Sequence, residues 1–312
     1  MKKLSTIIII LITIIISMII YLHVTDEKKQ TQIKISDTKI ELTEKVKITF
    51  LDIGQGDATF IEFPNGEQML VDCAIDARII EALGRVMSFY DKSIDYLLVT
   101  HPDLDHYGGC TDVLQRFDVG NVVYTGLQKD YNEQWQAFWQ AIQAEKSTYF
   151  EIDSEDVWEI ASTTIHFLYP DHSIGQDSHI PGLAKEANAN NTSIVFKLSY
   201  GDMDVLLTGD AEEELEAYLI ETYQDQLGVE VLKASHHGSG GSSIVDFVNL
   251  VSPDHTVISA GLDNQYHHPS RRVLKRLERA KSQVWRTDTQ GDIELTISRD
   301  RVDIKTAQSV DK

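Results

Sequence analysis

Cysteine is almost absent from this chain of 312 residues, which contains only Cys73 and Cys110. Two thiols cannot form a disulfide scaffold or a zinc site built on cysteines. They could pair with each other in an oxidising compartment, but we expect buried free thiols. The chain must therefore rely on a hydrophobic core, for which 42% hydrophobic residues are an ordinary supply.

Positive charge is also scarce. The sequence has 28 lysines and arginines against 49 acidic residues, which gives a formal net charge of −21. This charge disfavours a general nucleic-acid-coating protein, because a polyanion would be repelled unless positive charge is locally concentrated. A globular enzyme is the expected class, and a polyanionic substrate would need a local patch of positive charge.

The N-terminal segment is predominantly apolar from Ile7 to Leu22 and follows Lys2 and Lys3. Its length suits a helix that crosses a bilayer, and no Ala-x-Ala-like cleavage site follows it. We predict a membrane anchor over residues 1–23, with a cleaved signal peptide and a secreted protein as the alternative. The two lysines orient the rest of the chain towards the cell exterior.

The charged segment 24–45 is predicted to be a linker, and residues 46–308 are predicted to form one domain. No internal repeat of fixed period is present. Short apolar β-rich runs come first as hairpins, one of them with Asn65-Gly66 at its turn, and then alternate with amphipathic helical runs. This order predicts two sheets packed face to face with helices outside. The irregular segment 171–191 is expected to lie over a site.

Four potential metal ligands follow the predicted strand "IDYLLVT" in the stretch "HPDLDHYGG". They are His101, Asp103, Asp105 and His106. Carboxylates mixed with imidazoles suit Zn²⁺, Mn²⁺ or Fe²⁺ better than soft metals. Gly108 and Gly109 then let the backbone turn into a helix. A solvated turn with capping residues is the alternative, and it accounts for the aspartates but not for histidines at both ends.

Two further motifs follow predicted strands. Asp210 ends "LLTGD", where a carboxylate can bridge two metal ions or instead cap the next helix. His236 and His237 lie in "KASHHGSGGSS", so at least one imidazole is presented at the end of a strand. A pair of surface histidines is the alternative.

A basic helix is predicted after His267 and His268. The region holds seven of the 28 basic residues, namely Arg271, Arg272, Lys275, Arg276, Arg279, Lys281 and Arg286. A helix N-terminus binds phosphate, and a neighbouring imidazole can donate to one of its oxygens. We therefore predict that His268, Ser270, Arg271 and Arg272 contact the substrate, with a solvated amphipathic face as the alternative.

Taken together, these motifs resemble the metallo-β-lactamase fold superfamily, and specifically the hydrolase domain of the ComEC group of competence proteins. The matching stretches are "FLDIGQGDA", "LLVTHPDLDHYGG", "NNTSIVFKL", "VLLTGD", "LKASHHGS", "HHPS" and "RTDTQGDI", which span about residues 47 to 298. The resemblance implies an α/β fold, a four-layer αββα sandwich, with two divalent metal ions, Zn²⁺ or Mn²⁺, at one edge.

The resemblance also implies roles for individual residues. His101 and Asp103 would bind one ion, Asp105 and His106 the other, and Asp210 would bridge them, with His236 or His237 completing the set. Asp57 and Asp72 would lie beside the ligands, and Asn191 would contact the substrate. Asp103 stands where the superfamily more commonly has histidine, a departure that the ComEC group shares and that favours harder ions such as Mn²⁺. The ComEC channel proteins have many membrane spans and this chain has one predicted anchor, so a role in DNA uptake is not implied.

We therefore expect a phosphodiesterase or nuclease that acts on DNA or another extracellular phosphodiester, with Asp105, Asp210 and His268 as catalytic residues. A hydrolase of a lactone, an amide or a teichoic-acid phosphorylcholine ester is the alternative enzyme. A surface-displayed binding module without activity is the alternative from another class. We expect attachment to the membrane through the anchor and no obligate protein partner.

Overall fold

The computed structural model describes residues 45–128, 133–144 and 146–307. The anchor predicted over residues 1–23 and all but the last residue of the predicted linker fall outside these ranges. Within them, no helix is both long and apolar enough to cross a membrane. The predicted domain limits and the anchor therefore stay predictions.

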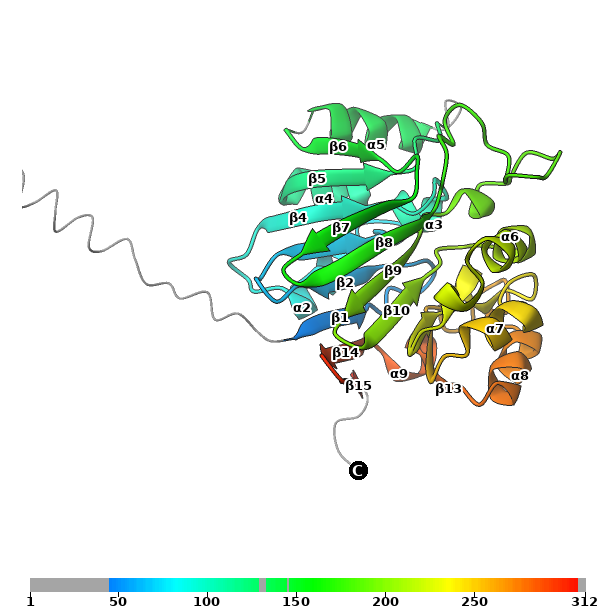
Figure 1. Ribbon diagram of the computed structural model, residues 1–312. Helices are drawn as coiled ribbons and strands as arrows, with labels where there is room; N and C mark the ends of the chain where they lie inside the picture. The colour runs from blue at the N-terminus through cyan, green and yellow to red at the C-terminus, as the bar shows by residue number, and fades with distance from the viewer. Residues whose placement is uncertain (1–44, 129–132, 145, 308–312) are drawn as a thin grey trace, which may run out of the picture. The chain divides into compact units, whose positions relative to one another are not determined.

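Two β-sheets form the centre of the fold (Figure 1). The first has eight strands in the order β15 (Arg301–Thr306), β14 (Ile293–Ser298), β1 (Val46–Phe50), β2 (Thr59–Glu62), β3 (Gln68–Val71), β4 (Ser93–Leu98), β5 (Asp118–Tyr124) and β6 (Thr148–Glu151). The second has seven, in the order β13 (Gln283–Arg286), β12 (His255–Ile258), β11 (Val231–Lys233), β10 (Met203–Leu207), β9 (Val195–Tyr200), β8 (Thr163–Tyr169) and β7 (Asp156–Ile160).

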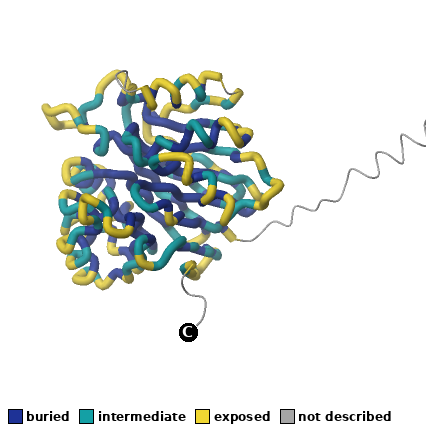
Figure 2. The backbone as a smooth tube through the Cα atoms, turned by 180° about the vertical axis from the view of Figure 1, so that it is seen from behind, coloured by how far each residue is buried: buried dark blue, intermediate teal, exposed yellow. Residues whose placement is uncertain are grey.

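A hydrophobic core fills the space between the sheets. On β1 the alternate residues Val46, Ile48 and Phe50 belong to this core, opposite Ile297, Leu295 and Ile293 of β14. Alternation with period 2 is what turns one face of a strand towards a core. Figure 2 shows the central strands as the most deeply buried part of the backbone.

Helices cover the outer face of each sheet through separate apolar clusters. The first sheet is covered by α2 (Arg78–Val86), α4 (Cys110–Arg116) and α5 (Glu133–Ala144), and the second by α6 (Glu213–Tyr223), α7 (Val245–Val251) and α8 (Arg271–Arg279). The short helices α3 (Leu104–Tyr107) and α9 (Thr287–Gln290) and the 3₁₀ turns η1 (Asn190–Thr192), η2 (Gln224–Leu227) and η3 (Ser235–Gly238) complete the set described. The predicted αββα sandwich is confirmed.

The topology brings distant segments to one edge of the sandwich. Strands β3, β4 and β5 run parallel to one another, as do β10, β11 and β12. The carboxyl ends of parallel strands meet at the same edge of a sheet, where ligand sites of α/β folds are commonly found. His101 follows β4, Asp210 follows β10 and His236 follows β11, so all three come to this edge.

Three strands lack the apolar pattern by which a strand is predicted from the sequence. The residues of β6 and β15 and most of those of β7 are exposed or only half-buried. Each of these strands also carries charged residues, so none shows an apolar run. Strands β13 and β14 are neighbours in sequence but belong to different sheets.

The cysteine prediction is wrong in one respect. Cys73 and Cys110 are fully buried, as expected, but they form a disulfide. Cys73 comes directly after Asp72 at the end of β3, and Cys110 begins α4. The bond therefore joins the two segments that flank the metal-ligand motif of residues 101–109.

Replacing both cysteines with alanine should lower the free energy of unfolding by about 2–4 kcal/mol, because the bond closes a loop in the unfolded chain. The sequence separation of this loop is 37 residues. Urea denaturation of the parent and of the double variant measures the difference. Equal midpoints with equal slopes would show that the disulfide contributes nothing.

Candidate metal centre

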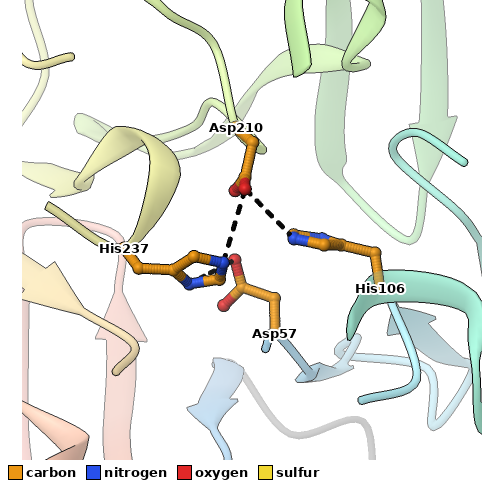
Figure 3. A group of neighbouring side chains, drawn as sticks. All are labelled: Asp57, His106, Asp210 and His237. Carbon is orange, nitrogen blue, oxygen red and sulfur yellow. Dashed lines mark ion pairs between the residues drawn. The ribbon is translucent and has the colours of Figure 1, made fainter. Parts of the chain in front are cut away.

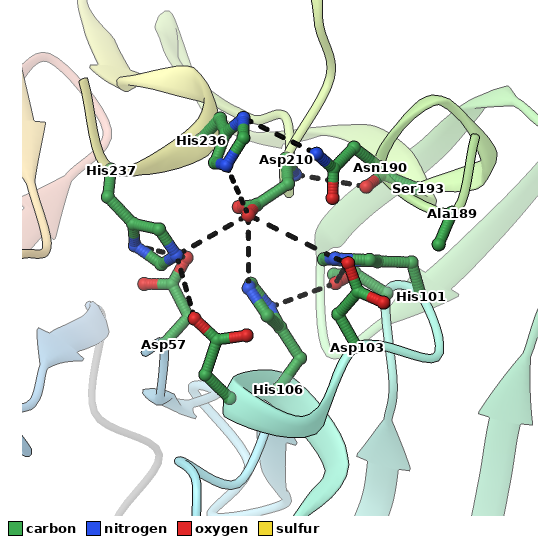
Figure 4. Close-up of polar contacts among 12 residues, drawn as sticks. Asp57, His101, Asp103, His106, Ala189, Asn190, Ser193, Asp210, His236 and His237 are labelled. Carbon is green, nitrogen blue, oxygen red and sulfur yellow. Dashed lines mark hydrogen bonds and ion pairs between the residues drawn. The ribbon is translucent and has the colours of Figure 1, made fainter. Parts of the chain in front are cut away.

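The carboxylate of Asp210 is the centre of a ring of imidazoles. Its Oδ2 atom lies 3.3 Å from Nε2 of His106, 3.4 Å from that of His237, 3.7 Å from that of His236 and 4.0 Å from that of His101. Its backbone N–H donates to Ser193 Oγ at 2.9 Å, which anchors the turn after β10. Figures 3 and 4 show the side chains pointing at this carboxylate from different elements.

The turn after β4 supplies four of the predicted ligands. His101 is fully buried, and its Nε2 lies 3.7 Å from Asp103 Oδ2. Helix α3 then carries Asp105 and His106, and Asp105 Oδ2 lies 3.5 Å from His237 Nε2. Gly56 packs against this turn with φ +108°, and a Cβ atom there would lie 2.2 Å from the carbonyl oxygen of Asp105. Glycine is therefore required at position 56 for both reasons.

Asp72 lies directly behind His106. Its Oδ2 is 2.7 Å from His106 Nδ1, and it also accepts from the Thr100 hydroxyl at 2.8 Å. Thr100 N donates to the other oxygen, Oδ1, at 2.8 Å. A carboxylate at Nδ1 makes that nitrogen a donor and leaves the Nε2 lone pair for a metal ion.

His236 and His237 occupy η3 with left-handed backbone at both positions, φ 48° and 52°. This conformation turns both imidazoles towards Asp210. The spacing of the residues in the sequence could not decide which of the two would face the site. His237 Nδ1 lies 3.1 Å from the carbonyl oxygen of Ser259, to which it can donate. His236 Nδ1 lies 3.2 Å from Glu212 Oε1. Each imidazole thus has a partner behind it and Nε2 in front.

A buried ion pair lies beside the centre. Lys233, on β11, places Nζ 2.5 Å from Asp57 Oδ2, and both side chains are about 95% buried or more. Burial acts against the charge of Lys233, but Asp57 and Asp210 raise its pKa above the ordinary value. Asp57 Oδ2 also lies 4.0 Å from His237 Nδ1. Asp57 therefore belongs to the cluster, and its charge is balanced by the lysine.

The electrostatics of the cluster are those of tightly coupled acids and bases. Burial, together with neighbouring His106, lowers the pKa of His101 to about 4. Burial acts in the same direction on His237, but Asp210 and Asp105 outweigh it and raise the pKa of His237 to about 10. His237 and His106 overcome burial at Asp210 and hold its pKa well below the ordinary range. The carboxylate of Asp210 is thus ionised at neutral pH.

The donor set fits a divalent metal ion. Nε2 of His101, His106 and His237 and Oδ1 of Asp210 are buried atoms without a hydrogen-bond partner among the residues that the structure describes. Ligand atoms of Asp57, His106, Asp210 and His237 lie within 4.8 Å of one another. Buried polar atoms are rarely left unpaired, and mixed imidazole and carboxylate donors suit Zn²⁺ or Mn²⁺. We conclude that the cluster is a site for divalent metal.

The residues predicted to contact substrate are placed less uniformly. The ring of His268 lies 5.7 Å from that of His236, measured between centroids, so it reaches the centre. Ser270 Oγ accepts from Val273 N and caps α8. Arg271 and Arg272 are exposed in the first turn of that helix.

Asn191 does not fit the substrate role predicted for it. Its side-chain oxygen accepts from Glu212 N at 2.8 Å, and its amide donates to Glu214 at 3.1 Å. The side chain is thus committed to the start of α6. Asn190, one position earlier, faces the centre instead, since its Nδ2 lies 2.9 Å from Glu212 Oε1 and 3.5 Å from His236 Nδ1.

Sequence reasoning missed Asn190, Glu212 and Lys233. Asn190 is next to the predicted Asn191, so the motif indicated the correct segment but not the correct residue. Glu212 is one of several acidic residues at the start of α6, and from the sequence it would be interpreted as a charge that caps this helix. Lys233 ends an apolar strand, where burial of a lysine requires a partner that only the fold supplies.

The family follows from comparison with known proteins. A family model described as the Metallo-beta-lactamase superfamily matches residues 51–261, a span that includes every residue of the cluster from Asp57 to His237. The chain therefore belongs to the metallo-β-lactamase superfamily. This agrees with the fold and with the metal-binding cluster.

Within that family the chain is similar to competence proteins, as predicted. ComE operon protein 3 of Bacillus subtilis is 30% identical over 274 residues, which cover 81% of this chain and 33% of that protein. Recombination protein 2 of Haemophilus influenzae is 29% identical, over 84% of this chain and 30% of its own length. Competence protein ComA of Neisseria gonorrhoeae is 26% identical, over 81% and 32%. The chain spans about a third of the length of these relatives.

Solved structures are more distant. CmlA, a diiron β-hydroxylase from Streptomyces venezuelae, aligns with 81% of this chain and 54% of its own at 15% sequence identity, with a TM-score of 0.46. A similarity this low says nothing about the chemistry of the present site.

Replacing Asp72 with asparagine should weaken binding of divalent metal by about 10- to 100-fold, because His106 loses the carboxylate that orients it. Asparagine preserves the size of the side chain. The affinity is measured by competition with a chelating dye. Asp95→Asn is the matched control, since Asp95 accepts from Gln68 N at 2.8 Å at the opposite end of β3 and β4. Equal affinities of Asp72→Asn and Asp95→Asn would contradict the role of Asp72.

Glu216 holds the loop that carries the paired histidines. It is fully buried on α6 and accepts from Ser235 Oγ at 2.8 Å, from Ser243 N at 2.7 Å and from Ile244 N at 2.8 Å. Burial raises its pKa to about 7, against these donors, from an ordinary value of 4.5. Between these two pH values the folded state binds the proton more tightly than the unfolded state does.

The contribution of Glu216 to stability should therefore be present at low pH and be lost as pH rises through about 7. Relative to Glu216→Gln, which cannot titrate, the free energy of unfolding of the parent should fall by up to about 3 kcal/mol between pH 4.5 and 8. Urea denaturation of both proteins across this range measures it. A constant difference between them would rule out titration of Glu216.

Proposed function

We propose that this chain is a metal-dependent phosphodiesterase that acts on DNA or on another extracellular phosphodiester. The observation that carries the proposal is the Asp210 cluster together with His268 beside it. When bound, two divalent ions, Zn²⁺ or Mn²⁺, would activate a water molecule and offset negative charge on the phosphate. The protein's own residues hold these ions, orient the ester and accept the proton.

The donor atoms around Asp210 fall into two groups. His237 Nε2 lies 3.5 Å from Asp105 Oδ2, and His101 Nε2 lies 3.7 Å from Asp103 Oδ2. Asp105, His106 and His237 would hold one ion, and His101, Asp103 and His236 would hold the other. Asp210 faces both groups, as a bridging carboxylate would. Asp57 remains paired with Lys233 and is assigned to neither ion.

The local charge explains why metal is required for such a substrate. Five aspartates line the centre, Asp57, Asp72, Asp103, Asp105 and Asp210, and Lys233 is paired with one of them. A phosphodiester would be repelled by this site unless divalent cations reversed its sign. The exposed Arg271 and Arg272 add positive charge next to His268. Two of the seven basic residues predicted for this region are not available, because Arg276 donates to the carbonyl oxygens of Ser242 and Ser243 and Arg286 pairs with Asp288.

His268 and Asp105 take the remaining roles. Burial, together with His236 and His237, lowers the pKa of His268 to about 4, so the imidazole is neutral and can donate one hydrogen bond to a phosphate oxygen. Asp105 is more accessible than Asp210, with side chains 24% and 4% exposed respectively. Asp105 is therefore the better acceptor for the proton of the attacking water. Asp210 is enclosed by imidazoles and serves to hold the ions.

Two observations support the choice of substrate and location. Relatives are named for competence and for recombination, which favours DNA among the phosphodiesters. The disulfide between Cys73 and Cys110 is typical of proteins outside the reducing cytosol, in agreement with the predicted anchor and an extracellular catalytic domain.

The test is hydrolysis of bis-p-nitrophenyl phosphate by the purified protein with Mn²⁺ or Zn²⁺. The parent should turn over the ester, and Asp105→Ala should lower kcat by about 100-fold or more through loss of a proton acceptor and ligand. Asp202→Ala is the control, because Asp202 is exposed in the turn before β10, at the opposite end of that strand from Asp210. No turnover by the parent, or equal rates in Asp105→Ala and the parent, would refute the proposal.

A further inference from the structure

An aromatic side chain lies at the surface next to the metal centre. Tyr266, in the loop after β12, is 56% exposed. Its ring stacks on that of His268 with 5.8 Å between centroids and 20° between planes. His268 in turn meets His236 edge to face at 5.7 Å. Two ring-to-ring steps therefore lead from a predicted metal ligand to the solvent.

The loop that carries Tyr266 is held in place by Asn264. The Asn264 amide donates to the carbonyl oxygens of Gly261 at 2.8 Å and of His268 at 2.6 Å. The His268 N–H donates back to Asn264 Oδ1 at 2.9 Å. These bonds close the loop on itself on both sides of Tyr266. The ring is thus positioned before any ligand arrives, which reduces the entropy lost on binding.

We propose that Tyr266 is a stacking platform for a nucleobase next to the scissile phosphate. This inference rests on the proposed phosphodiesterase function and specifies its substrate as a single-stranded or frayed nucleic acid. His268 covers one side of the ring, and more than half of Tyr266 is open to solvent, so a planar base can lie on the other side. Stacking of bases on aromatic side chains is independent of sequence and strong enough to place a strand.

The surroundings favour a base over a quaternary ammonium group. A choline cation is recognised by a cage of several aromatic faces. Tyr266 pairs with the single ring of His268 among the residues for which the structure gives contacts. The exposed Arg271 and Arg272 follow within a few residues, and they would repel a cation but suit the phosphates that flank a base.

The experiment compares two substrates of the full chain with Mn²⁺. One is a thymidine dinucleotide, and the other is the same phosphodiester with abasic sugars. The parent should prefer the base-bearing substrate in kcat/KM by about 5- to 150-fold, the range expected for stacking of one base. In Tyr266→Ala this preference should collapse towards one, mainly through KM, whereas Tyr266→Phe should retain it.

Tyr90→Ala is the matched control. Tyr90 is 89% exposed and lies just before β4, at the end of that strand opposite His101. Its replacement should leave the preference unchanged. A parent without preference, or a preference that survives in Tyr266→Ala, overturns the platform. A loss in Tyr266→Ala that is equal for both substrates also overturns it, because it indicates a structural role.

Two further outcomes separate this inference from the function on which it rests. Faster hydrolysis of glycerophosphocholine than of the dinucleotide, lost in Tyr266→Ala, would show that the ring binds a cation and would overturn the nucleobase assignment. If the parent hydrolyses nothing, the proposed function fails. The stacking role of Tyr266 is then tested by binding, measured as the fluorescence anisotropy of thymine and abasic oligonucleotides. The inference is supported if Tyr266→Ala binds the thymine strand more weakly than the parent does, and the abasic strand equally well.

Discussion

The attraction between one buried carboxylate and the imidazoles around it is the interaction on which this site depends. Asp210 follows a strand of the second sheet, and His106 follows a strand of the first, so their contact at 3.3 Å joins the two halves of the sandwich. Neither partner is satisfied by the protein alone, because Nε2 of His106 and Oδ1 of Asp210 have no hydrogen-bond partner among the described residues. The fold thus creates a need for a cation at the edge where both sheets end.

Much of the surrounding structure keeps that arrangement rigid. Asp72 and Glu212 stand behind two of the imidazoles, and Ser259 offers a carbonyl oxygen to a third. The disulfide ties the segment after Asp72 to the helix that follows the ligand turn. Support of this kind is what holds metal ligands within reach of productive geometry.

The fold and the ligand motifs could be predicted because they rest on local rules. Alternating apolar residues and turn signals predicted two packed sheets with helices outside, and polar residues at strand ends marked His101, Asp105 and Asp210 as candidate ligands. The resemblance to the superfamily then implied that these residues share one site. What could not be predicted depends on contacts between distant segments. Cys73 and Cys110 pair only because α2, β4 and α3, which lie between them in the sequence, bring the end of β3 next to the start of α4. The buried charge of Lys233 depends on Asp57. Asn190 and Asn191 are neighbours in an irregular turn, and the sequence does not indicate which of the two faces the centre.

The backbone at His236 and His237 has a consequence for how this sequence can change. Two successive residues with side chains adopt left-handed conformations there, at a cost of roughly 1–3 kcal/mol each, whereas glycine would adopt them freely. Substitution by glycine would therefore relieve the backbone while removing the imidazole. The two imidazoles are thus directed at Asp210 at a cost to the stability of the chain.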